Sequence, residues 1–196
     1  MVFASLIAIV WSLLIGSNYI PFLLLLLLST FFFVCIYISS NKFKILELDK
    51  KSCVLSIFIT WLLLISMGSI PLYIMFPKEE IKDIFFLSVS LTTTSGVWTE
   101  IQNLDNPEFL IWQAILQWLG GLCTILVGSF FVEMILRKKN IIKDYFSIEN
   151  IKIIFYLFLL FTIIFTLLFK LLSYSWANSI QLSMALISTS NAYLPN

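Results

Sequence analysis

The amino-acid sequence predicts an all-α integral membrane protein in which long spanning helices alternate with short re-entrant ones. Hydrophobic residues make up 60% of the 196 positions and charged residues only 12%. The mean hydropathy is +1.01. Soluble domains carry about 25% charged residues, so a soluble fold of this size has no means of burying so much apolar surface. The lengths of the apolar runs complete the prediction.

The sequence contains five apolar runs. Each of the last four reaches about 20 residues, the length that a helix needs to cross the hydrocarbon core. The first run is shorter. Gly16, Ser17, Asn18 and Pro21 interrupt the N-terminal block, which is therefore either two helices or one kinked helix, and we favour two. The runs are Val2–Ile15, 20–38, 53–76, 109–136 and 151–172.

Charge is distributed unevenly between the connections. Basic residues gather after the second run and before the last, whereas acids predominate between the third and the fourth. The positive-inside rule then predicts a multi-pass protein with a cytoplasmic N-terminus and an acidic outer connection. The membrane in which we expect it is the plasma (inner) membrane. The basic residues are Lys42, Lys44, Lys50, Lys51, Arg137, Lys138, Lys139, Lys143 and Lys152, and the acids are Glu79, Glu80, Asp83, Glu100, Asp105 and Glu108.

The composition also argues against several functions. The chain has no histidine, the commonest general base, and no convergent acid–base cluster within the apolar runs, so we do not expect an enzyme. The net charge of +1 gives no indication of a nucleic-acid partner. The three cysteines are far apart and have no metal-binding spacing, and nothing calls for a cofactor.

The outer connection contains an apolar segment, 78–91, that is too short to span the membrane. About a dozen helical residues reach about 18 Å, roughly half of the hydrocarbon core, which is typical of a re-entrant helix. Glu79 and Glu80 are expected in its first turn, where negative charge suits the helix dipole. The alternative is an ordinary interfacial helix whose Ser/Thr side chains satisfy their own backbone.

A polar run, Thr92-Thr93-Thr94-Ser95-Gly96, follows this segment. Its hydroxyl and carbonyl oxygens suit the coordination of a dehydrated cation, and Gly96 is free to adopt a positive φ. The order then recurs: the span 151–172 is followed by the short amphipathic segment Trp176–Ile187 and by Ser188, Thr189, Ser190 and Asn191. Internal repeats are common in transport proteins, with the site at the repeat interface.

Small and polar residues mark the span between the two runs. Gly120, Gly121 and Gly128 are interpreted first as sites of close helix packing, because glycine lets backbones approach. Gln117 is a candidate to bond the backbone of a neighbouring loop, and Trp118 is either interfacial or buried.

From about Ser52 onward the chain resembles the membrane subunit of Trk-type potassium transporters, of the Trk/Ktr/HKT superfamily. The resemblance rests on short stretches spread along the chain. They are Gly68-Ser69-Ile70-Pro71, Asp83-Ile84-Phe85-Phe86, Thr93-Thr94-Ser95-Gly96, Leu116-Gln117-Trp118-Leu119-Gly120-Gly121 and Ala185-Leu186-Ile187 with the run that follows.

The resemblance implies repeats of helix, pore helix, filter loop and helix around one pore. It divides the chain into an N-terminal helix pair with a basic loop (1–51), a first complete repeat (52–140) and a second, incomplete repeat (141–196). The chain is then expected to be the N-terminal portion of a longer transporter. Counting from Asp83 places the filter glycine of the first repeat at Gly96, whereas counting back from Gln117 places it at Ser95; we choose Gly96.

The function implied by the resemblance is potassium transport, with Thr93, Thr94, Ser95 and Gly96 as filter residues. Ser188, Thr189, Ser190 and Asn191 would form a second, partial filter, in which Asn191 replaces the family's glycine. The implied partners are the lipid bilayer, the remaining pore repeats or another membrane subunit, and a cytoplasmic nucleotide-binding regulatory subunit. The alternative is a non-conducting truncated relative, or a regulatory or scaffold membrane subunit.

Overall fold

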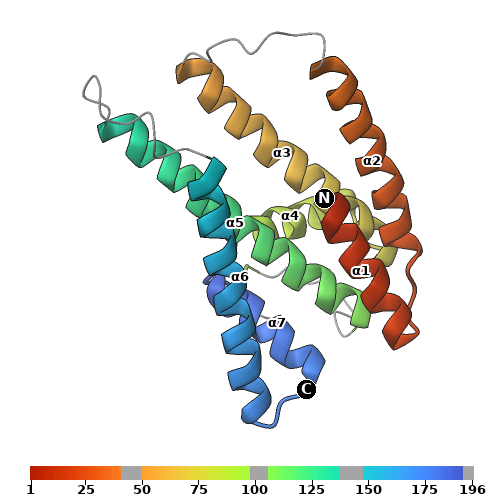
Figure 1. Ribbon diagram of the computed structural model, residues 1–196. Coiled ribbons are helices and arrows are strands. Elements are labelled where there is room, and N and C mark those ends of the chain that lie inside the picture. The colour runs from red at the N-terminus through yellow and green to blue at the C-terminus, as the bar shows by residue number, and fades with distance from the viewer. Residues whose placement is uncertain (41–49, 98–105, 137–147, 192–196) are drawn as a thin grey trace. The chain divides into compact units, whose positions relative to one another are not determined.

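A computed structural model describes residues 1–40, 50–97, 106–136 and 148–191 of the chain (Figure 1). Within these ranges all regular secondary structure is α-helical, which confirms the predicted all-α class, while the re-entrant position of the short helices stays a prediction. The helices are α1 (Val2–Ile15), α2 (Ile20–Ser40), α3 (Lys50–Met75), α4 (Ile81–Thr92), α5 (Pro107–Leu136), α6 (Ile148–Leu171) and α7 (Trp176–Ile187).

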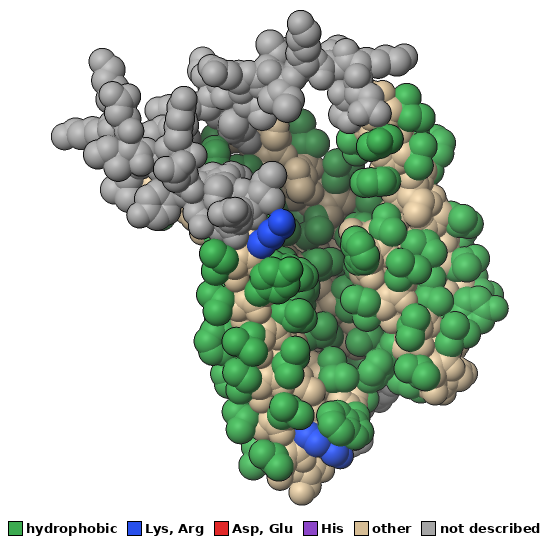
Figure 2. Space-filling model, in the orientation of Figure 1, with side chains coloured by type: hydrophobic (Ala, Val, Ile, Leu, Met, Phe, Trp, Pro, Cys, Tyr) green, Lys and Arg blue, Asp and Glu red, His purple; other side chains and the backbone are tan. Residues whose placement is uncertain are grey.

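Four of these helices are long and apolar enough to cross a membrane, and their spans are Ile20–Ser39, Val54–Met75, Pro107–Val132 and Ile151–Leu171. Only 11% to 33% of each apolar window is buried within the protein. Figure 2 shows the result, a visible face covered by hydrophobic side chains with few basic groups. Surface of this kind is stable against lipid and not against water, so the chain is a multi-pass membrane protein.

The N-terminal block forms two helices, as favoured from its sequence. Gly16 ends α1 with a left-handed conformation, φ 73°, and the Ser17 N–H donates to the Ser12 carbonyl at 2.8 Å. This is the hydrogen bond of a Schellman cap, for which glycine is the preferred residue. α1 has 14 residues and falls short of the length of a span.

The short helix α4 begins later than expected. Its first residue is Ile81, so Glu79 and Glu80 precede the helix and Asp83 is the acid in its first turn. The reason is the Glu80 carbonyl, which accepts the backbone N–H groups of Asp83 and Ile84 and thus marks the helix boundary. Beside it Lys82 pairs with Glu80 at 2.8 Å, and this hydrogen bond with its negative charge raises the pKa of Lys82.

The described chain divides into two compact units. The first comprises residues 1–89 and 97–112, and in it α1 packs on α2 and α2 packs on α3. The start of α5 is held in this unit by aromatic residues. The Trp112 indole N–H donates to the Gly68 carbonyl of α3 at 2.9 Å, and the ring of Phe109 lies edge-on to that of Phe76, 5.5 Å between centroids.

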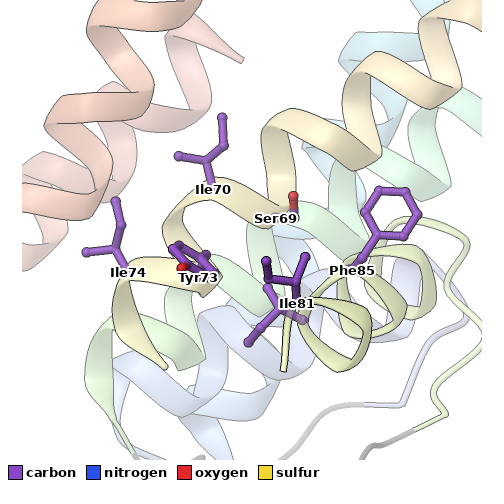
Figure 3. Close-up of a pocket in the computed structure, with 7 residues that line it drawn as sticks. Ser69, Ile70, Tyr73, Ile74, Ile81 and Phe85 are labelled. Carbon is purple, nitrogen blue, oxygen red and sulfur yellow. The ribbon is translucent and has the colours of Figure 1, made fainter. Parts of the chain in front are cut away.

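An apolar pocket of about 290 Å³ lies in the first unit between α3 and α4. Figure 3 shows the lining residues that it labels, which come from both helices. Two lining residues, Ser69 and Tyr73, carry hydroxyls, and that of Ser69 donates to the Ser66 carbonyl within α3 at 2.8 Å. The lining residues are Ser69, Ile70, Tyr73, Ile74, Ile81, Ile84 and Phe85.

The second unit comprises residues 90–96 and the chain from Gln113 onward, and in it α6 packs on α7. It therefore contains the end of α4, most of α5, and both polar runs. Most of the basic loop residues, with Glu100 and Asp105, lie outside the described residues or have side chains that are not described. The orientation in the membrane and the division at residues 51 and 140 stay predictions.

Candidate functional site

The first polar run follows the C-terminal end of α4 as a tight reversal. The Thr94 N–H donates to the Leu91 carbonyl at 3.3 Å, and the Ser95 N–H donates to the Ser90 carbonyl at 3.1 Å. Thr94 has a φ of 56° and Gly96 a φ of 68°. This is the hydrogen-bond pattern of a Schellman cap, with a β-branched threonine where glycine is usual.

The second polar run has the same geometry after α7. The Thr189 N–H donates to the Leu186 carbonyl at 3.1 Å, the Ser190 N–H donates to the Ala185 carbonyl at 2.9 Å, and Thr189 has a φ of 54°. Both α4 and α7 have 12 residues. Matching the helices therefore pairs Thr94 with Thr189, Ser95 with Ser190 and Gly96 with Asn191. The repeat inferred from the order of segments is present in the backbone geometry.

The two short helices are also anchored alike. The Ser88 hydroxyl of α4 donates to the Ile65 carbonyl of the preceding helix, α3, at 2.7 Å. Ser183 occupies the matching position of α7, and its hydroxyl lies 2.7 Å from that of Thr166 on the preceding helix, α6. Each short helix is thus fixed to the span before it by a buried serine at the same place in the helix.

Adjacent glycines of α5 contact the ends of both short helices. A Cβ atom built on Gly120 would overlap the Thr92 carbonyl group, whose carbon would lie 2.8 Å away. A Cβ on Gly121 would lie 2.7 Å from the Cβ of Ser188. Close packing is therefore confirmed for these two glycines. For Gly128 no described atom lies within 4 Å of its Cβ position, so its packing interpretation stays a prediction.

The two polar runs meet at the positions that the repeat makes equivalent. A Cβ on Gly96 would lie 2.8 Å from the Cβ of Asn191 and 3.4 Å from its backbone nitrogen. Only glycine fits at position 96, for two reasons: φ is positive there, and Asn191 occupies the space that a side chain would need. The expected filter residues Thr93 to Gly96 and Ser188 to Asn191 lie together, and the structure does not test what they bind.

Polar side chains of α5 support this arrangement. The Gln117 amide Nε2 donates to the Asn191 carbonyl at 2.8 Å, so the expected bond from Gln117 to a loop backbone is present and goes to the second loop. Trp118 packs against Phe158, with 5.1 Å between ring centroids, and its indole N–H donates to the Thr162 hydroxyl at 2.9 Å. Of the two interpretations of Trp118, packing inside the protein is confirmed.

The site offers oxygen atoms and no charged side chain among the residues just described. The C-terminal ends of α4 and α7 both lead into it and bring a partial negative charge. Thr92 and Ser188 are buried, whereas Thr93, Ser95, Thr189 and Asn191 are exposed. Such a set of hydroxyl and carbonyl oxygens suits a cation that gives up its hydration shell.

Some features of the site were not predicted from the sequence. The first loop is closed by a contact between the hydroxyls of Ser90 and Ser95, 3.1 Å apart. The second loop lacks this contact because Ala185 replaces Ser90 at the matching position. Matching the two runs residue by residue is the signal that reveals this difference.

Known proteins show a resemblance over part of their length. No family model matches the chain. It is 28% identical over 188 residues to an uncharacterized cation transporter of Methanocaldococcus jannaschii, a match that covers 89% of this chain and 39% of that protein. It is 33% identical over 72 residues to the Trk system potassium uptake protein TrkI of Halomonas elongata, over 36% of this chain and 14% of that protein. The chain thus spans about two-fifths of the first relative's length and about a seventh of the second's.

Proposed function

We propose that the chain forms part of a pathway for potassium, or a similar monovalent cation, across the membrane. The observation that carries the proposal is the contact between Gly96 and Asn191, which joins two loops of the same backbone geometry at equivalent positions. Two relatives named as a cation transporter and as a potassium uptake protein support it.

The proposed mechanism is permeation without covalent chemistry. Oxygens of Thr93, Thr94, Ser95 and Gly96, and of Ser188, Thr189, Ser190 and Asn191, replace water around the ion. The helix ends of α4 and α7 favour the positive charge there. Threonine in the left-handed region costs conformational energy, and such strain is retained where a function needs the backbone orientation it gives.

Two loops enclose only part of an ion path. We propose that further pore repeats, or another membrane subunit, complete it, which agrees with the greater length of the relatives. A cytoplasmic nucleotide-binding regulatory subunit, a location in the plasma membrane and a cytoplasmic N-terminus belong to the same proposal.

A second candidate function is that of a non-conducting scaffold or regulatory subunit. It is favoured by Asn191, which brings a side chain to the position where the first loop has glycine. The added bulk lies directly beside Gly96 and narrows the space that an ion would use.

Uptake of Rb⁺ by cells that lack their own potassium transporters distinguishes the two functions. The chain is expressed alone and together with the membrane proteins encoded beside it. Transport predicts uptake that Gly96→Ser lowers or makes less selective. Gly16→Ser is the matched control, because Gly16 has a similar φ of 73° and open space around it. No uptake in any combination, or equal uptake by both variants, would support the scaffold instead.

A further inference from the structure

Two buried amides of α5 have side-chain atoms without hydrogen-bond partners among the described residues. Gln113 and Gln117 are both fully buried. Neither the Nε2 nor the Oε1 atom of Gln113 has a partner in the structure, and the same is true of the Gln117 Oε1 atom. These residues are four positions apart on one helix, so their side chains lie on the same face.

The second loop adds another such atom. The Ser190 hydroxyl is buried and has no partner, because Ala185 stands where Ser90 serves the first loop. Ser190 is the chain neighbour of Asn191, whose carbonyl accepts the Gln117 amide at 2.8 Å. Gln113 and Gln117, on one face of α5, and Ser190, the neighbour of the residue that Gln117 bonds, are together called the amide cluster below.

Burying a polar group without a partner costs about 1–3 kcal/mol in proteins, so several such atoms in one cluster require an occupant. The Gln113 NH₂ group needs an acceptor, whereas Oε1 of Gln113 and of Gln117 need donors. A cation would satisfy the oxygens and be repelled by the NH₂ group, and an anion would do the reverse. Water both donates and accepts, and a buried water makes about three hydrogen bonds.

We infer that the amide cluster binds ordered water, which links α5 to the second polar loop. The first loop does not require such water, because the hydroxyls of Ser90 and Ser95 contact each other and close that loop. The two loops are therefore held differently, the first by its own hydroxyls and the second by α5 and the water bound there. This inference does not depend on whether the protein conducts ions.

The variant Gln113→Leu tests the inference, because leucine has a similar size and no polar atoms. With water in the cluster, the substitution removes partners of that water and leaves Gln117 and Ser190 poorly satisfied. The unfolding equilibrium constant of the purified protein should then rise about tenfold. If the cluster is dry, the same substitution removes two unsatisfied atoms and the constant should fall, which would overturn the inference.

Two further measurements identify the occupant. The effect of Gln113→Leu should be equal in K⁺ and in a large organic cation such as N-methylglucamine; an effect that disappears without K⁺ would assign the cluster to a metal ion and refute water. In the unsubstituted protein, water-edited solid-state NMR should transfer magnetisation from water to the Gln113 side-chain amide. The lack of such transfer, with the amide signal itself visible, would also refute the inference, even if the variant fails to fold.

Discussion

Replacing Gly96 with alanine measures how tightly the two loops meet. Alanine at a φ of 68° costs about 1–2 kcal/mol, the usual penalty of an L-residue in the left-handed region. Its Cβ would also lie 2.8 Å from the Cβ of Asn191, which is shorter than the distance of about 3.5–4.0 Å at which two carbon atoms attract each other. Overpacking of this kind costs about 1–3 kcal/mol, so Gly96→Ala should destabilise the protein by about 2–5 kcal/mol in total.

Gly16 provides a control for the cost of the left-handed conformation. Gly16 has a φ of 73° and no atom within 4 Å of its Cβ position, so Gly16→Ala should cost only about 1–2 kcal/mol. The double variant Gly96→Ala/Asn191→Gly isolates the second cost. It removes the crowding and keeps the backbone strain, so the coupling energy between the two substitutions should be about 1–3 kcal/mol.

The assay is equilibrium unfolding in mixed micelles, in which a denaturing detergent is titrated against the three single variants and the double variant. The reasoning would be refuted if Gly96→Ala cost no more than Gly16→Ala. The reasoning would also be refuted if adding Asn191→Gly to Gly96→Ala restored no stability, because the crowding would then come from another residue.

The other contacts of the site predict effects in the same assay. Gly121→Ala should cost about 1–3 kcal/mol by overlap with the second loop, whereas Gly128→Ala, in open space, should gain up to about 1 kcal/mol of helix propensity; equal effects would contradict the packing. Trp118→Phe should cost about 1 kcal/mol through the lost hydrogen bond to α6, and no loss of stability would argue against that bond. Ser88→Ala and Ser183→Ala should each cost about 1–2 kcal/mol, and a large difference between them would contradict their equivalence.

Length and hydropathy were sufficient to predict the helices. The bounds of α7 agree with the expected segment, and those of α2, α3, α5 and α6 differ from the expected runs by a few residues, since helix ends depend on local caps. The predicted start of α4 was wrong because acids just before a helix and acids in its first turn both suit the helix dipole. Charge alone therefore does not locate the boundary.

The site was predictable in part. Two hydroxyl runs after two short helices pointed to Thr93–Gly96 and Ser188–Asn191 as a pair, and the glycines of α5 pointed to close packing. Which glycine contacts which loop depends on the rotation of α5 about its axis, which the sequence does not specify for a helix with little contrast between its faces. The left-handed threonines were unpredictable because β-branched residues normally avoid that conformation.

The two ways of closing the loops imply an order of assembly. The Ser90–Ser95 contact joins residues only five positions apart, so the first loop can close as soon as α4 is made. The bond from Gln117 to Asn191 joins residues 74 positions apart, and it waits for α6 and α7 to be synthesised and inserted. Because α5 is synthesised before α6 and α7, the second polar loop reaches its final conformation against a helix that has already been made.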